Sequence, residues 1–452
     1  MNRIIAFLTK LFFKDTASAN IQTVLDKSSK VFILHFLAVI LTFGGNVLIA
    51  RWFGDEIYGL YSLLFSWLAV LAIFAQIGMD DYHLAVVPAM HLSEDYGSLR
   101  KILRISTAGI IIASVIVVVI FYSIINLLPI PGLHENAAVF SVGLWLIILH
   151  ALNSNYSSFL RGYGTIVQSQ LAEKVIRPLV FLLLIVPLAN SFGPGSDIIY
   201  KLIVISAISL FISFCYLFFL TKKGLGHKPY SNPVSFEQLR FGRNGYFLLL
   251  TILYFLTTRL DILSVGLISE VKDVGYYNVA MKIAEIVGYP AIIINLVAPT
   301  FLARQHFREN KSETYKLIQN GARLTFAGCV ILFILILFAG KWLLGLYGFN
   351  FRIAFLPLLI LGISQLVTAF SGPAAIFFIV SGREKTATFC MFINVMVTAL
   401  CCFIMIPAWG IAGAALASLT GTVVFNALII ISFYRFEKVL ITPVKIFGRP
   451  NF

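Results

Sequence analysis

The chain has 452 residues, of which 59% are hydrophobic and 12% charged, and its mean hydropathy is +0.93. A soluble domain carries roughly 25% charged residues and its outer layer must face water, so this composition excludes an ordinary soluble fold. The net charge of +14 does not indicate nucleic-acid binding, because the basic residues fall in short connections between apolar runs.

The sequence has no local signature of a catalytic or cofactor site. Its five cysteines lie inside apolar runs and form no CxxC pair, so neither a disulfide framework nor a zinc site is expected. It contains no GxxxxGK[ST] loop for nucleotide phosphates and no HExxH motif of a metalloprotease. We therefore predict a protein that is not an enzyme and uses no cofactor and no metal.

Residues 1–30 are predicted to form a cytoplasmic amphipathic segment. Apolar residues up to Phe12 recur at helical spacing, which is typical of a helix lying on a membrane surface. A signal peptide is the alternative, because small residues follow at 17–19. Lys10 and Lys14 interrupt the apolar stretch and argue against that alternative.

The apolar runs that follow predict an all-α, polytopic membrane protein with about 12 transmembrane helices. A helix needs about 20 apolar residues to cross a bilayer, and Pro, Gly and charged residues separate runs of that length here. In chain order, the predicted spans are 31–53, 58–79, 103–128, 137–160, 171–190, 198–220, 244–268, 275–300, 322–347, 353–380, 385–406 and 409–434.

Basic residues predict the orientation and the division of the chain. Lys and Arg gather in alternate connections, which places both termini in the cytoplasm. The longest basic connection, the predicted linker 221–243, separates an N-terminal six-helix bundle at 31–220 from a C-terminal six-helix bundle at 244–434. Residues 435–452 form a cytoplasmic tail. With an even number of spans in each half, a repeat would be parallel.

A short echo between the halves supports that repeat. Gly59-Leu60-Tyr61 opens the second predicted span and Gly275-Tyr276-Tyr277 opens the eighth. An acidic residue precedes each by a few positions, Glu56 and Asp273.

The C-terminal half carries four charges inside predicted spans, where a charge is costly and indicates function. Asp261 and Lys282 each lie about 10 Å below the periplasmic boundary and could pair. Lys282 could instead pair with Glu285, three residues on. Arg259 has no obvious carboxylate, and its planar guanidinium suits a phosphate. The structural alternative is that these ion pairs only join two helices.

The charges of the N-terminal half lie nearer the predicted span ends. Arg51 closes the first span, and Asp80 and Asp81 follow the second. A solvated, interfacial role is expected for most of them, although Arg177, leading into the fifth span, could point into a cytoplasm-facing cavity. His150 is expected to be a hydrogen-bonded packing residue.

The last predicted span is rich in small residues. Gly410, Gly413 and Gly421 alternate with alanines there. Small side chains let helix backbones approach closely, so we predict tight helix packing.

Several short segments, in a consistent order over nearly the whole chain, carry a family resemblance. They are Ala50–Tyr61, Gln76–Asp80, Arg161–Gly164, Glu173–Pro178, Leu260–Leu263, Val274–Tyr277 and Pro407–Ala415. Together they resemble the bacterial polysaccharide flippases of the Wzx (O-antigen translocase) type, in the multidrug/oligosaccharidyl-lipid/polysaccharide exporter superfamily.

The resemblance implies two six-helix bundles around a central, cationic cavity in the bacterial inner membrane. It implies a transporter that flips undecaprenyl-diphosphate-linked oligosaccharide, the repeat unit of O-antigen lipopolysaccharide, capsule or exopolysaccharide, to the periplasmic leaflet by alternating access. The partners would be this lipid-linked substrate, membrane lipids, a coupling ion (H+ or Na+) and polysaccharide assembly proteins, with no nucleic acid.

The candidate residues divide by charge. For substrate binding in the cavity they are Arg259, Lys282, Arg177 and Arg51, and for ion coupling or gating they are Asp261, Glu285, Asp80 and Asp81. A drug/cation antiporter of the same superfamily is the alternative, with Asp261 and Glu285 binding the cation. A membrane-embedded polysaccharide polymerase is disfavoured by the short connections.

Overall fold

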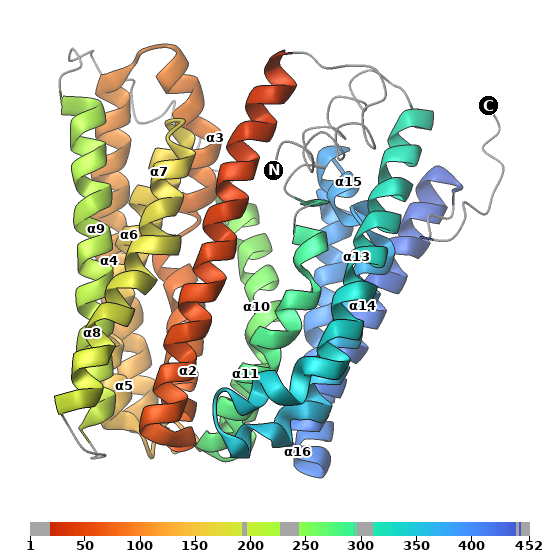
Figure 1. The fold of residues 1–452 in the computed structure, drawn as a ribbon. Helices are drawn as coiled ribbons and strands as arrows, with labels where there is room; N and C mark the ends of the chain where they lie inside the picture. Colours follow the sequence, from red (N-terminus) through yellow and green to blue (C-terminus); the bar gives the residue numbers. More distant parts are fainter. Residues whose placement is uncertain are drawn as a thin grey trace. The chain divides into compact units, whose positions relative to one another are not determined.

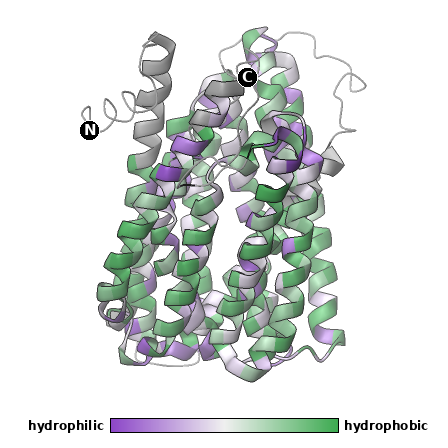
Figure 2. Cartoon of the chain, turned by 90° about the vertical axis from the view of Figure 1, so that its right-hand side faces the viewer, coloured by the Kyte–Doolittle hydropathy of each residue, from purple (hydrophilic) through white to green (hydrophobic). Residues whose placement is uncertain are grey.

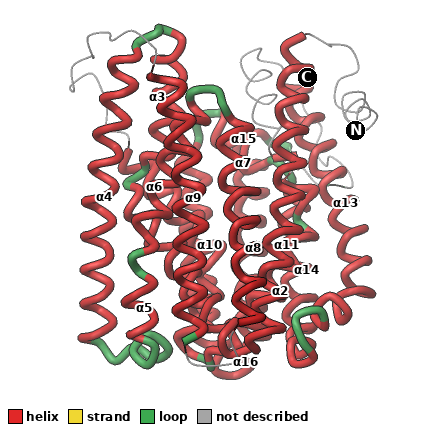
Figure 3. The backbone as a smooth tube through the Cα atoms, turned by 60° about the vertical axis from the view of Figure 1, so that its left-hand side comes forward, coloured by secondary structure: helices red, strands yellow, loops and turns green. Residues whose placement is uncertain are grey.

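Every regular element in the described part of the chain is a helix (Figure 3). The computed structural model describes residues 19–191, 197–226, 244–292, 294–295, 311–439 and 443. The predicted amphipathic residues before 19, most of the predicted linker and most of the predicted tail lie outside these ranges.

Seven helical stretches among the described residues are long and apolar enough to cross a membrane. Two of them contain a sharp kink at a glycine, α2 (Ala19–Gln76) at Gly54 and α16 (Glu384–Glu437) at Gly410 (Figure 1). These glycines have φ values of 88° and 56°, which residues other than glycine rarely adopt. Each of the two stretches therefore supplies two spans.

Most of the other helices follow the predicted runs, and α3 is the main exception. They are α3 (Met79–Leu92), α4 (Tyr96–Leu127), α5 (Ala137–Gly143), α6 (Leu146–Gly162), α7 (Ile166–Leu171), the π-helix η1 (Ala172–Ile176), α8 (Arg177–Ser191), α9 (Ile198–Gly226), α10 (Asn244–Ile268), α11 (Val271–Val287), α13 (Lys311–Gly345), the 3-10 helix η4 (Phe349–Ala354), α14 (Phe355–Ser371) and α15 (Ala374–Val380).

Large apolar side chains remain exposed along the long helices, and hydrophobic residues make up most of these helices (Figure 2). Phe338 is 81% exposed and Phe403 74%. Apolar surface costs roughly 25 cal/mol per Å² in water, and lipid removes that cost. The chain is therefore a multi-pass membrane protein, as the sequence predicts.

The chain divides into two compact units. The N-terminal unit is Lys30–Leu256, and the C-terminal unit is Thr257–Phe452 together with Met1–Ser29. The division falls inside α10, beyond the predicted linker at 221–243.

In the N-terminal unit, α6 is the central helix and packs against α3, α4 and α9. The contact with α3 is close because Gly162 has no side chain, and a Cβ there would lie 2.7 Å from the carbonyl oxygen of His83. At the end of the unit that is rich in basic residues, Arg100 Nη2 donates a hydrogen bond of 2.5 Å to the carbonyl oxygen of Leu225. This bond ties α4 to the end of α9.

The helix that follows the second predicted span differs from the prediction. The backbone breaks at Ile77 and Gly78, which both have positive φ, but it resumes as α3 and stays helical to Leu92. Asp80 and Asp81 therefore lie in the first turn of a helix and not in a connection. The two acids lower the local hydropathy, but the apolar residues after them continue a helix that packs on α6.

In the C-terminal unit, α14 is the central helix and packs against α11, α13 and α16. The two arms of α16 lie against each other, because a Cβ on Gly421 would overlap the side chains of Thr398 and Asn394. A Cβ on Gly413 would likewise overlap the backbone at Met405. The predicted tight packing of the small-residue span is confirmed.

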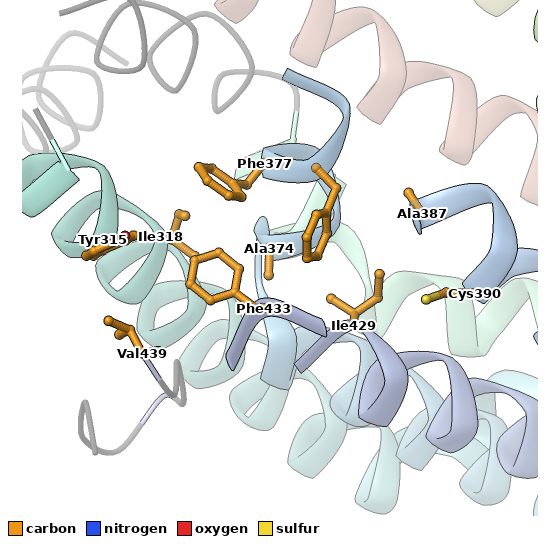
Figure 4. Packing of buried hydrophobic residues seen from close by; sticks show 10 residues of the cluster. Tyr315, Ile318, Ala374, Phe377, Ala387, Cys390, Ile429, Phe433 and Val439 are labelled. Carbon is orange, nitrogen blue, oxygen red and sulfur yellow. The ribbon is translucent and has the colours of Figure 1, made fainter. Parts of the chain in front are cut away.

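One end of the C-terminal unit is closed by a buried cluster of α13, α15 and α16 (Figure 4). Tyr315 OH donates to Glu437 Oε2 at 2.6 Å, and Arg383 Nη1 donates to Glu437 Oε1 at 2.8 Å. Burial and the Glu437 carboxylate raise the pKa of the Tyr315 phenol, so it stays a donor at neutral pH. The cluster consists of Tyr315, Ile318, Ala374, Phe377, Phe378, Ala387, Cys390, Ile429, Phe433 and Val439.

Candidate functional site

The charges of the C-terminal unit lie on α10 and α11, which are consecutive helices. Asp261 is 4% exposed. Its Oδ2 accepts a hydrogen bond of 2.6 Å from Tyr277 OH, and its Oδ1 accepts one of 2.8 Å from the backbone N–H of Ile262. The carboxylate thus takes its hydrogen bonds from a phenol and the backbone, and the suggested pairing with Lys282 is not formed.

Arg259 and Lys282 are both half-buried, and neither is in an ion pair with a carboxylate of the described residues. Lys282 interacts electrostatically with the carboxylate of Glu285 and is repelled by Arg259. Two positive groups that repel each other in a low-dielectric region are stabilised by an anion between them. The arrangement can therefore bind a phosphate or another multivalent anion.

The N-terminal unit has a third cation, Arg177, directly after the π-helix η1. In a regular helix Glu173 would lie four residues from Arg177 on the same face. The wider turn of η1 changes that register, and the two side chains form no ion pair within 4.0 Å. π-helical turns often mark functional sites. Arg177 interacts electrostatically with the phenol of Tyr61 and the imidazole of His150, and at longer range with the carboxylate of Glu173.

His150 is a second polar group near Arg177. Its Nδ1 atom is buried and has no hydrogen-bond partner among the described residues. A neutral imidazole next to a guanidinium can accept or donate a hydrogen bond to a bound ligand. The sequence predicts a hydrogen-bonded packing role for His150, but its Nδ1 atom makes no hydrogen bond to the described residues.

The remaining candidates differ in their exposure. Arg51 is exposed on α2, a turn before the kink at Gly54. Glu285 is exposed on α11 and Asp81 half-buried on α3. Asp80, next to Asp81, contacts α6 through a hydrogen bond of 2.5 Å that Ser154 Oγ donates to Asp80 Oδ2.

Sequence reasoning missed several polar residues of α6 and the role of Tyr277. The signal for α6 was visible, because Asn153-Ser154-Asn155 and Ser157-Ser158 interrupt a run that is otherwise apolar. Tyr277 gave no such signal, since a tyrosine near a span end is typical of any membrane interface.

Comparison with known proteins identifies both a family and a fold. A family model described as polysaccharide biosynthesis protein matches residues 24–301. No curated protein sequence matches the chain at a significant level.

Several solved structures share the fold. An inward-facing multidrug resistance MATE family transporter of the MOP superfamily has a TM-score of 0.70 and 12% identity, over 90% of this chain and 97% of that one. The lipid II flippase MurJ, in an inward closed conformation, has a TM-score of 0.69 and 15% identity, over 89% of this chain and 87% of that one. A MOP superfamily transporter from Pyrococcus furiosus, whose binding pocket is described as having reverse polarity, has a TM-score of 0.62 and 13% identity, over 90% and 94%.

These matches confirm the predicted polytopic helical fold of about 12 spans.

Proposed function

Because the chain belongs to the polysaccharide biosynthesis protein family, we propose that it flips an undecaprenyl-diphosphate-linked oligosaccharide across the bacterial inner membrane. The substrate would be a repeat unit of O-antigen, capsule or exopolysaccharide. The basic-rich helix ends support a cytoplasmic location of both termini.

The observation that carries the proposal is the pair Arg259 and Lys282. In the described part of the chain, these two half-buried cations form no ion pair within 4.0 Å, and Glu285 acts on Lys282 and Arg259 on Asp261 only at longer range. Cations in this setting favour an anionic ligand. A diphosphate offers several oxygens, and a guanidinium can bind two of them at once. Cationic drugs would be repelled by these groups, so the antiporter alternative is disfavoured.

In the N-terminal unit we infer a role in substrate binding for Arg177, with Arg51 nearer the span end. We infer that alternating access exposes these cations to one leaflet and then the other, while the polyprenyl tail stays in lipid. The sugar would pass through the polar interior of the protein.

The test is Arg259→Ala in a strain that lacks the wild-type protein. A hydrogen bond to a charged group contributes about 1.5–3 kcal/mol, so surface polysaccharide should fall by about tenfold or more. Arg352→Ala is the matched control, because Arg352 lies in the same unit over the ring of Phe349 at 5.0 Å. Both variants are compared at equal membrane abundance.

Normal polysaccharide in Arg259→Ala would contradict the assignment. A gain in drug sensitivity without a change in polysaccharide would support the drug/cation antiporter. Polysaccharide of altered chain length, with undiminished export, would support a polymerase.

A further inference from the structure

Two cations lie at the end of the C-terminal unit opposite to its buried cluster. Tyr315 of that cluster lies in the first turns of α13 and Gly345 ends the helix, about 45 Å away at 1.5 Å per residue. Lys341 is exposed near the end of α13, and Arg352 is exposed in η4. The predicted topology places this end on the periplasmic side, where basic residues are few. Two neighbouring cations are therefore an exception to the charge pattern of the chain.

Both cationic side chains are held against aromatic rings. Lys341 Nζ lies 5.0 Å from the centroid of the Phe355 ring, and Arg352 Cζ lies 5.0 Å from that of Phe349. A cation is attracted to the face of an aromatic ring, so each ring helps to orient its cation. Gly345 lets the guanidinium approach α13, because a Cβ there would lie 3.3 Å from both Nε and Nη2 of Arg352. The two cations are thus positioned by their surroundings.

The two cations are also near each other. Lys341 and Gly345 are four residues apart in α13, so they lie on the same face, about 6 Å apart along the helix axis. Because the Arg352 guanidinium lies beside Gly345, both positive groups belong to one patch of this face. Neither forms an ion pair within 4.0 Å with a carboxylate of the described residues. Like charges at this spacing repel each other, and an anion that contacts both removes the repulsion.

A purely structural role explains only part of this arrangement. Cations near the last carbonyl groups of a helix are stabilised by the helix dipole, and both groups lie near the end of α13. The dipole does not explain the large apolar side chains exposed beside the cations. Trp342 is 64% exposed, Phe349 78% and Ile353 66%. Cations next to exposed apolar side chains at the end of a membrane span suit an amphiphile, and a tryptophan there is typical of the headgroup level.

We propose that Lys341 and Arg352 bind the phosphate of an anionic phospholipid, whose acyl chains lie against the exposed apolar side chains of Trp342 and Ile353. The guanidinium offers two donors to the phosphate oxygens and the ammonium a third. A zwitterionic headgroup would bring its own ammonium next to two cations, with no carboxylate of the described residues in ion-pair contact with them. A free phosphate would leave the apolar side chains uncovered.

This lipid is not the cargo, so the inference does not rest on the proposed function. The cations proposed to bind cargo lie on α10 and α11, whereas Lys341 and Arg352 lie on α13 and η4. Arg352→Ala therefore remains a control for cargo binding by Arg259.

Lipid retention is measured on the full-length protein purified in detergent. Phosphatidylglycerol or phosphatidylcholine with the same acyl chains is added, and bound lipid is counted by native mass spectrometry. The wild type should retain phosphatidylglycerol in preference. Lys341→Gln and Arg352→Gln should each weaken its binding by about tenfold, because each removes a charged donor to the phosphate.

The matched control is Lys272→Gln, which removes the same charge from an exposed lysine of the same unit. Lys272 already has a carboxylate partner, since its Nζ lies 2.6 Å from Glu270 Oε2. This variant should retain phosphatidylglycerol as the wild type does. An equal loss in Lys272→Gln would show that overall charge holds the lipid, and would overturn the proposal. So would equal retention of the two lipids by the wild type.

Two further measurements locate the site and identify its ligand. Phosphatidylglycerol with a photoreactive headgroup should label a proteolytic fragment that contains residues 341–353, and this labelling should be lost in the Lys341→Gln/Arg352→Gln double variant. Labelling of this fragment that persists in the double variant would overturn the proposal. Inorganic phosphate should not displace the lipid, because it makes no apolar contact. Full displacement by phosphate would assign a site for soluble anions in place of a lipid site.

Discussion

The two units of this protein place their polar groups differently. In the N-terminal unit, polar side chains of α3 and α6 bond to each other and leave several buried atoms unpaired. In the C-terminal unit, α10 and α11 carry charged side chains, and the carboxylate of Asp261 accepts two hydrogen bonds. The polar groups of the N-terminal unit therefore join two helices, whereas Arg259 and Lys282 of the C-terminal unit form no ion pair within 4.0 Å among the described residues.

A pair of tyrosines shows how the predicted repeat has diverged. Tyr61 and Tyr277 occupy matching places in the sequence echo. Tyr277 donates to the carboxylate of Asp261. Tyr61 lies beside the hydroxyl of Ser206 and near Arg177. One tyrosine has a carboxylate as its partner and the other a hydroxyl, so the two positions of the sequence echo are not equivalent.

The largest expected effect comes from disrupting a close helix–helix contact at a glycine. Both units have such a contact, at Gly162 and at Gly421. Gly421→Leu would drive a side chain into Thr398 and Asn394 and separate the arms of α16. Overpacking costs about 1–3 kcal/mol where the neighbouring side chains can move. The cost is higher here, because the two arms of α16 are joined and cannot move apart freely. We expect almost no monodisperse protein by size-exclusion chromatography.

Gly109→Leu is the matched control for this substitution. A Cβ on Gly109 in α4 meets nothing within 4 Å, so this variant should elute as the wild type does. A folded, monodisperse Gly421→Leu protein would show that the close approach of the two arms is not required.

Much of this fold could be predicted from the sequence, because apolar runs of membrane length leave little choice of structure. The two spans of α16 and their close packing could be predicted from the sequence, the packing from its small residues. The continuation of α3 beyond Asp80 was not, since two acids end an apolar run even where the helix continues. The π-helix before Arg177 was also missed, because no local residue pattern predicts a wide turn.

The candidate site could be predicted only by residue type. The charges of α10 and α11 stand out in an apolar sequence, so Arg259, Asp261 and Lys282 were found. Their partners were not, because helix rotation decides whether Asp261 meets Lys282 or Tyr277. His83 was missed because it lies in a stretch predicted to be a connection, and its partner Ser158 is distant in sequence.

An effect of intermediate size is expected from replacing the two tyrosines, Tyr277 and Tyr61, with phenylalanine. Tyr277→Phe removes the donor to a carboxylate that is 4% exposed. Hydrogen bonds to charged groups contribute about 1.5–3 kcal/mol and those between neutral groups about 1 kcal/mol. Tyr277→Phe should therefore lower the free energy of unfolding more than Tyr61→Phe does. Thermal unfolding of both variants in the same detergent measures the difference, and equal effects would mean that the two tyrosines have equivalent surroundings.

The smallest expected effect concerns Arg383, whose side chain lies at one end of the C-terminal unit. In the C-terminal unit Arg383 binds a carboxylate, Glu437, and lies over the ring of Phe436 at 4.6 Å. In the N-terminal unit Arg100 donates to the backbone carbonyl of Leu225. The Arg383 side chain is 39% exposed, so solvent screening limits its ion pair to about 0.5 kcal/mol.

Arg383→Gln should lower Tm by only about 1–2 °C, and the loss should shrink at high salt because salt screens partly exposed charges. Thermal scans of Arg383→Gln and of the wild type at low and high salt test this expectation. A salt-independent loss in Arg383→Gln would assign its contribution to packing on Phe436, and the C-terminal end would then be held by apolar contact and not by charge.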